Sequence, residues 1–152
     1  MIQAKAQIEI FAPAEVVFAV LWDVESYPDF LTDIVDAQIN AVPEPFVQDC
    51  TFRVTFIRSR TYALRMQGQP GRRLAWTLLT GENMLTNQGQ WQLRPAADER
   101  SCHVNYELDL DLAVVLAEAV LKKMIDFNLP TMMRQVKARS EYRYRQLVGP
   151  IA

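Results

Sequence analysis

The chain has 152 residues, half of them hydrophobic, and a formal net charge of −2. This length and composition predict one folded domain over residues 1–152 with a sizeable core, and they exclude a disordered chain. The small negative charge argues against a protein whose whole surface binds nucleic acid.

The first elements are a strand and a short helix. Residues 3–11 alternate between polar and apolar side chains, which predicts a half-buried strand rather than the continuous apolar core of a signal peptide. Pro13 suits the first turn of a helix, and helical spacing of valines and leucine then predicts a helix from Pro13 to about Asp23. Pro28 disfavours helical geometry at Tyr27 and predicts a break there.

Residues 34–112 have the character of strands. The segments TFRVTFI, TYALRMQ, RLAWTLLT and CHVNYELDLDL each place apolar side chains on one face and polar side chains on the other. Turn signals such as QPGR and TGEN separate them. The pattern predicts an antiparallel meander of about six strands, covered on one side only.

The C-terminal third is predicted to supply that cover. A helical stretch runs from about Val114 to Phe127, and an amphipathic helix follows from Leu129 to about Leu147. Pro130 predicts a kink or break near Asn128. No segment is long and apolar enough to predict a membrane span.

The expected fold is therefore of the α+β class. A curved antiparallel sheet wraps around the long C-terminal helix, and short helices follow the first strand. Such a sheet is larger than one helix can fill, so the space between them either packs closed or forms an apolar cavity for a small ligand.

Three segments resemble a known family: DVESYPDFL after the first helix, NQGQWQLRP at the penultimate strand, and CHVNYELDLDL before the final helix. Their order is similar to the START-related helix-grip (SRPBCC) superfamily. The nearest groups are the polyketide cyclase/dehydrase-like proteins, the coenzyme Q-binding proteins and the ribosome-association toxins. The resemblance implies a START-like domain that binds a lipid, a quinone or a polycyclic aromatic.

The candidate ligand-binding residues are the apolar side chains expected to face one another across the sheet and helix. They are Phe52, Val54, Phe56, Leu64, Met66, Trp76, Leu78, Tyr106, Leu108, Met124, Phe127, Met133 and Val136. Trp76 and Tyr106 each carry a polar tip that suits a ligand carbonyl or hydroxyl. The alternative is that all these side chains form a packed core.

The mouth of the cavity is predicted at the aromatic cluster after the first helix, formed by Tyr27, Pro28, Phe30 and Leu31. The resemblance places ligand access near these loops and the start of the long helix. The sequence favours a plug that closes this end, and the mouth is the alternative role of the same cluster.

No catalytic residue, metal site or cofactor is predicted. His103, the one histidine, falls on the polar face of its strand, and the separated Cys50 and Cys102 match neither a zinc motif nor a disulfide framework. Reduced thiols indicate a cytoplasmic protein. A cyclase or dehydrase acting in the same cavity stays open as an alternative.

The C-terminal segment from Lys122 to Arg145 carries seven basic residues against two acidic ones. The basic residues are Lys122, Lys123, Arg134, Lys137, Arg139, Arg143 and Arg145. A solvated helix face explains them, and peripheral contact with an anionic membrane or a ribosome is the alternative.

Overall fold

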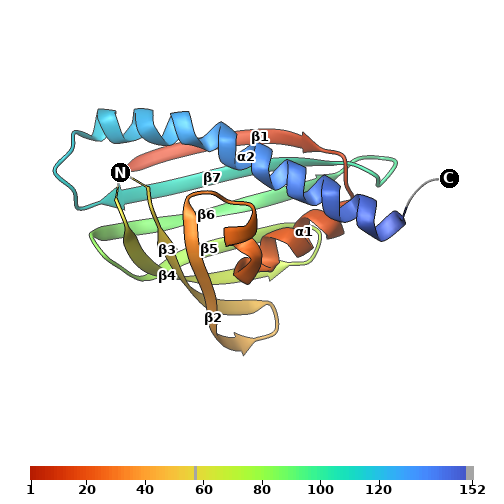
Figure 1. The fold of residues 1–152 in the computed structure, drawn as a ribbon, viewed down its shortest axis with the longest axis horizontal. Coiled ribbons are helices and arrows are strands. Elements are labelled where there is room, and N and C mark those ends of the chain that lie inside the picture. The colour runs from red at the N-terminus through yellow and green to blue at the C-terminus, as the bar shows by residue number, and fades with distance from the viewer. Residues whose placement is uncertain (57, 150–152) are drawn as a thin grey trace.

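One curved antiparallel sheet wraps around a long helix in the computed structural model, which describes residues 1–56 and 58–149 (Figure 1). The elements in chain order are β1 (Ile2–Ile10), α1 (Ala14–Trp22), the 3-10 helix η1 (Val24–Asp29), β2 (Ile34–Glu44), β3 (Val47–Val54), β4 (Arg60–Gln69), β5 (Arg73–Gly81), β6 (Met84–Pro95), β7 (Cys102–Leu112) and α2 (Glu118–Val148). The predicted fold class, with six strands after the short helices, is confirmed.

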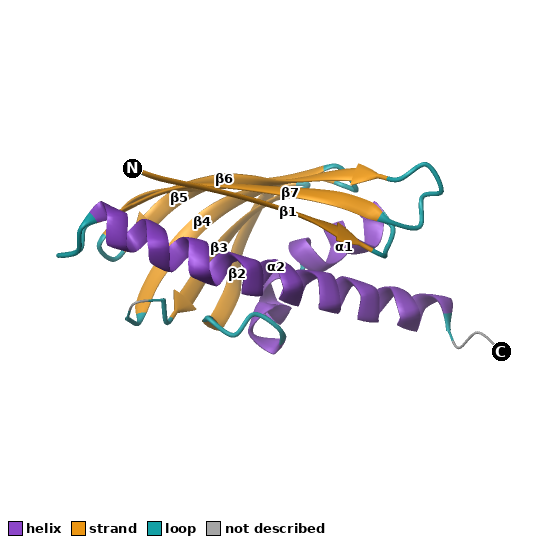
Figure 2. Ribbon diagram, turned by 90° about the horizontal axis from the view of Figure 1, so that it is seen from above, coloured by secondary structure: helices purple, strands orange, loops and turns teal. Residues whose placement is uncertain are grey.

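The seven strands follow the order β1-β7-β6-β5-β4-β3-β2, and every neighbouring pair is antiparallel. The first strand therefore pairs with the last, while α1 and η1 carry the chain to the opposite edge of the sheet. Figure 2 shows α2 along the concave side of the sheet, with α1 near one end.

The long helix α2 buries one face. Its buried residues recur every three or four positions and are Leu121, Ile125, Leu129, Met133, Val136 and Ser140. This face packs mainly along β1 and α1. Because α2 packs at the β1 side of the sheet, its backbone does not lie close over β3 and β4. Space therefore remains over the aromatic side chains of these two strands.

Of the kink or break predicted near Asn128, the break is wrong, because α2 runs without interruption through Pro130 for 31 residues. Proline removes one hydrogen bond to the carbonyl four residues earlier, here that of Asp126. Both Pro130 and Asp126 lie on the exposed face, where water can satisfy that carbonyl. The helix also begins at Glu118, four residues later than the predicted Val114.

The short helices differ from the prediction in one respect. The helix α1 agrees with the expected span, but the change of geometry falls at Asp23 instead of Tyr27. The chain continues as η1, which holds the exposed Pro28 within its last turn, and the N–H groups of Phe30 and Leu31 both donate to the Tyr27 carbonyl. A 3-10 helix this short loses little when one residue lacks its N–H.

The core lies between the concave face of the sheet and the two α-helices. Cys50 and Cys102 are both buried within it as free thiols. None of the described helices is long and apolar enough to cross a membrane.

Candidate functional site

A cavity of about 240 Å³ lies between the concave face of the sheet and α2. Nine of the thirteen predicted ligand-binding residues line it: Phe52, Val54, Phe56, Leu64, Met66, Trp76, Tyr106, Leu108 and Val136. They come from β3, β4, β5, β7, the turn after β3 and α2. Strand alternation therefore placed the predicted residues of the sheet side, apart from Leu78, in the cavity lining.

The other four predicted residues lie outside this lining. Met133 is buried, and Leu78 and Met124 are partly buried. Phe127 is 87% exposed, so its predicted inward orientation is wrong. The buried neighbours Ile125 and Leu129 flank it two positions away on each side, and two residues turn an α-helix to nearly its opposite face.

Two of the four predicted mouth residues line the cavity. Tyr27 and Leu31 are buried in its wall, whereas Pro28 is exposed and Phe30 lies beneath the Arg139 guanidinium, 5.4 Å from its ring centroid. Tyr27 also stacks on Phe52, with ring centroids 5.9 Å apart. These contacts give Tyr27 and Leu31 the position of a wall rather than of an opening.

A partly exposed part of the lining lies just beyond them, where the start of β2 and the turn after β3 approach the middle of α2. Its residues are Asp33, Ile34, Phe56, Asn128, Thr131, Met132 and Gln135. Two hydrogen bonds cross this rim: the amide of Asn128 donates to the Asp33 carboxylate, and the amide of Gln135 donates to the Thr32 hydroxyl at 3.1 Å. We define these two pairs as the clasp.

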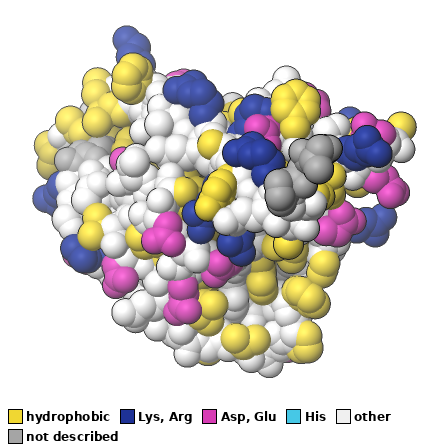
Figure 3. All heavy atoms as spheres, turned by 45° about the vertical axis from the view of Figure 1, so that its right-hand side comes forward, with side chains coloured by type: hydrophobic (Ala, Val, Ile, Leu, Met, Phe, Trp, Pro, Cys, Tyr) yellow, Lys and Arg dark blue, Asp and Glu magenta, His cyan; other side chains and the backbone are white. Residues whose placement is uncertain are grey.

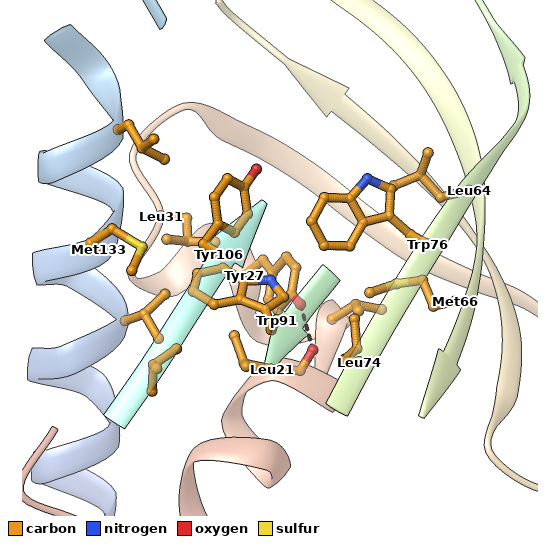
Figure 4. Packing of buried hydrophobic residues seen from close by; sticks show 14 of the residues in the cluster. Leu21, Tyr27, Leu31, Leu64, Met66, Leu74, Trp76, Trp91, Tyr106 and Met133 are labelled. Atoms are coloured by element: carbon orange, nitrogen blue, oxygen red, sulfur yellow. Dashed lines mark hydrogen bonds between the residues drawn. The ribbon is translucent and has the colours of Figure 1, made fainter. Parts of the chain in front are cut away.

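Stacked aromatic rings form two walls of the cavity. Phe52 lies between Tyr27 and Tyr62, with centroids 5.9 and 5.6 Å away. On the other side Tyr106 packs against Trp76 at 5.6 Å and edge-on to Trp91 at 4.7 Å. Figure 4 shows Tyr106 and Trp76 facing the space between the sheet and α2. Flat or apolar guests are well matched to such surfaces.

The indole N–H and the phenol hydroxyls of these rings differ in whether they already have a hydrogen-bond partner in the protein. The Trp76 indole N–H already donates to the Asn87 side-chain oxygen at 2.9 Å, and the Tyr27 hydroxyl donates to the Leu21 carbonyl. Within residues 1–56 and 58–149 the Tyr106 hydroxyl has no hydrogen-bond partner in the protein. Of the two tips predicted to orient a ligand, Tyr106 is therefore the free one.

Burial keeps the cavity phenols protonated. It raises the pKa of Tyr62 to about 12, and it raises the pKa of Tyr106 further, with the negative charge of ionised Tyr62 as a smaller cause. At neutral pH both hydroxyls are hydrogen-bond donors and acceptors and not phenolate bases.

Gly89 on β6 makes room for the indole of Trp76. A Cβ at this position would lie 2.6 Å from Trp76 Cζ2 and 2.1 Å from the Glu107 carbonyl oxygen. Only a residue without a side chain lets the ring lie flat against the sheet here. The glycine in the NQGQW segment is thus required by the shape of the cavity wall.

Sequence reasoning missed Arg60, a charged residue of the lining. Arg60 is 4% exposed and begins β4, where it shares the inward face with Tyr62, Leu64 and Met66. Among the described residues none accepts a hydrogen bond from its three guanidinium nitrogens. The alternation of RTYALRM carries the signal, because it places Arg60 in register with the apolar side chains.

The residues with familiar catalytic chemistry lie elsewhere. His103 contacts Glu9 and Gln7 on the outer face of the sheet, as alternation predicted. Across residues 1–56 and 58–149 no group of three or more His, Cys, Asp or Glu side chains is placed to hold a metal ion.

Several of the basic residues of α2 have partners inside the protein. Lys122 pairs with Asp126 at 2.7 Å, Lys137 pairs with Glu141 at 2.5 Å, and Arg139 lies 4.0 Å from Asp29. Figure 3 shows basic and acidic side chains interspersed on this face of the molecule. A solvated helix face with local ion pairs explains these three residues.

Comparison with known proteins places the fold. A family model described as polyketide cyclase / dehydrase and lipid transport matches residues 10–137. A START superfamily protein from Mycobacterium smegmatis superposes with a TM-score of 0.82 at 18% identity, covering 95% of this chain and 98% of that one. The Zhui aromatase/cyclase from Streptomyces sp. R1128 superposes with a TM-score of 0.83 at 20% identity, covering 97% and 98% of the two chains.

A third similar structure, TTHA0849 from Thermus thermophilus, has a TM-score of 0.80 at 15% identity and covers 91% of this chain and 96% of that chain. Among curated protein sequences none matches this chain. The START-related helix-grip fold predicted from the three sequence segments is confirmed.

Proposed function

Because the chain belongs to the polyketide cyclase/dehydrase and lipid transport family, we propose that it binds a hydrophobic small molecule in the cavity between the sheet and α2. The observation that carries the proposal is the cavity itself, about 240 Å³ of space lined mainly by apolar and aromatic side chains. An apolar cavity of about 150 Å³ suffices for benzene, and small-ligand sites begin near 300 Å³.

Burial of apolar surface would drive binding. A guest that removes about 200 Å² of apolar surface from water gains about 5 kcal/mol at 25 cal/mol per Å². Tyr106, with its free hydroxyl, supplies a polar contact that orients the guest. Lipids, quinones and polycyclic aromatics of a size that about 240 Å³ admits meet these requirements, since an apolar wall accepts many shapes.

A cyclase or dehydrase acting on a polyketide-like chain in the same cavity is the second candidate. The free Tyr106 hydroxyl favours it, because such a group can donate a hydrogen bond to a carbonyl that gains negative charge. The raised pKa of Tyr106 argues against its use as a base. Asp33, the carboxylate among the lining residues, is already bonded to Asn128. Turnover of a poly-β-ketone model substrate that the Tyr106→Phe variant loses would favour the enzyme over the carrier.

Native mass spectrometry of the purified protein tests the binding proposal by looking for a co-purified hydrophobic guest. A cavity-filling variant, Val54→Phe, supplies the structural control, because Val54 lines the cavity near its rim. The matched variant Arg53→Phe places the same ring on the exposed face of β3.

We expect Val54→Phe to lose at least tenfold in affinity for hydrophobic guests while Arg53→Phe keeps the wild-type affinity. If Val54→Phe binds as well as the wild type and retains its fold, the cavity is not the binding site. A protein that carries no guest and takes up none of a panel of lipids, quinones and polycyclic aromatics is not a carrier of this kind.

A further inference from the structure

Arg60 is a charged side chain inside an apolar cavity. It is only 4% exposed, and it lines the same space as Tyr62, Phe56 and Met84. All three of its guanidinium nitrogens are shielded from solvent and lack an acceptor among residues 1–56 and 58–149. A buried charge without a partner is among the most costly features a folded protein can hold.

Glu82 is the acidic residue whose charge acts on Arg60, but it does not offset the cost of burying the guanidinium charge. The charge of Glu82 favours protonated Arg60, but Glu82 is exposed and its carboxylate accepts the backbone N–H of Thr61 at 2.9 Å. Burial, together with the positive charge of Arg58, lowers the pKa of Arg60. Guanidinium groups nevertheless stay charged at neutral pH, so the cavity holds a cation whose counter-ion is missing from the described part of the protein.

We infer that the guest is a hydrophobic carboxylic acid whose carboxylate pairs with Arg60 while its apolar body lies between the aromatic walls. This inference rests on the proposed function and adds the chemical class of the ligand. A carboxylate is favoured over a neutral oxygen group because the planar guanidinium fork binds both its oxygens at once and gains most where water is excluded.

The placement of Arg60 supports an amphipathic guest with its charge at one end. Arg60 begins β4 and lines the cavity together with the partly exposed Phe56, whereas Leu64 and Met66 follow it along β4 into the wall. The net charge of the protein cannot explain a preference for anionic guests, because the whole chain carries a net charge of −2 and would repel them. A preference for acids would therefore report on Arg60 itself.

Two probes of nearly equal size test the inference by titration calorimetry at pH 7. They are 2-naphthoate, which is ionised, and 2-naphthamide, which is neutral. We expect the wild type to bind the acid at least tenfold more tightly than the amide, as charge-assisted hydrogen bonds require. Equal affinities overturn the assignment of Arg60 and leave the proposed function standing. If neither probe binds, and no other hydrophobic guest does, the proposed function is overturned with it.

Variants test whether the preference for the acid over the amide depends on Arg60. Arg60→Met should reduce the acid-to-amide ratio to within twofold of one while the amide still binds, and its ligand-free melting temperature should not fall, because an unpaired charge is removed. Arg60→Lys keeps the charge but loses the fork and should retain part of the preference. Arg53→Met, an exposed change of the same charge on the outward face of β3, is the control and should keep the wild-type ratio. A full preference retained in Arg60→Met, or one lost in Arg53→Met, overturns the inference.

Discussion

The clasp between α2 and the start of β2 leads to a prediction about the rate of ligand exchange. Its hydrogen bonds, Asn128 to Asp33 and Gln135 to Thr32, cross the part of the cavity rim that is partly exposed. Neither pair belongs to a strand ladder or to the helix backbone. Opening the clasp therefore separates two elements without unfolding either, and we predict that a guest enters and leaves here.

The expected magnitude follows from the two bonds. The Asn128–Asp33 bond is partly buried and the Gln135–Thr32 bond is exposed, so each is taken at about 1 kcal/mol. Removing both, in the double variant Asn128→Ala and Gln135→Ala, lowers the barrier to opening by up to about 2 kcal/mol, which corresponds to release up to about 30-fold faster. Entry should accelerate by the same factor, so the dissociation constant should change by less than about threefold.

Stopped-flow displacement of a fluorescent hydrophobic probe, anilinonaphthalene sulfonate, measures the release rate. The signal to follow is the part that Val54→Phe abolishes, because that part comes from the cavity. Arg134→Ala is the matched control, since Arg134 is exposed on the same helix and its one side-chain hydrogen bond among the described residues is to Thr131 within that helix. A release rate in the double variant within twofold of the wild type would show that guests pass elsewhere.

Two further predictions concern stability. Asn87→Ala leaves the buried Trp76 indole N–H without its acceptor, which costs about 2 kcal/mol of stability and lowers the melting temperature by roughly 4 to 8 °C. The control Gln88→Ala changes an outward side chain and should alter stability by less than about 0.5 kcal/mol. Thermal unfolding followed by circular dichroism measures both variants, and equal melting temperatures would refute the prediction. Burial raises the pKa of Cys50 to about 12 and that of Cys102 to about 11 from an ordinary value near 9, so the folded state holds protons that the unfolded state releases. The contribution of these two thiols to the free energy of unfolding should therefore be constant below pH 9 and fall as the pH rises from 9 to 12. Urea unfolding at pH 8, 9.5 and 10.5 measures it, and a Cys50→Ala variant should show a shallower loss.

Strand alternation predicted the sheet side of the cavity well because it is set by backbone geometry alone. In β3 and β4 every second residue faces α2, so Phe52, Val54, Leu64 and Met66 could be assigned without knowing the fold in detail. The same rule applied without regard to residue type would also have placed Arg60 inward. The prediction included only apolar side chains and therefore left out Arg60, the charged residue of the lining.

The helix side was predicted less well because the helix was divided at Pro130. Extending the spacing of Leu129 and Met133 backward through the proline gives Ile125 and Leu121, which are the buried residues. Treating Val114–Phe127 as a separate helix lost that phase and turned Phe127 inward. Whether a proline interrupts a helix depends on whether the freed carbonyl meets solvent, which a local pattern does not reveal.

The aromatic walls explain why space remains between the sheet and α2. In each wall the rings pack against one another, Tyr27 with Phe52 and Tyr106 with Trp91, instead of extending across the gap. Hydrogen bonds hold two of the rings in place, through the Tyr27 hydroxyl and the Trp76 indole. A guest therefore meets a lining whose side chains are already ordered, and it avoids a cost of about 0.5–1.5 kcal/mol for each side chain that binding would otherwise immobilise. Arg60 is the exception to this order, because its guanidinium has no partner among the described residues to fix it. The largest rearrangement on binding should accordingly be confined to Arg60, and the arginine side-chain resonances should shift with an acidic guest and stay unchanged with its amide.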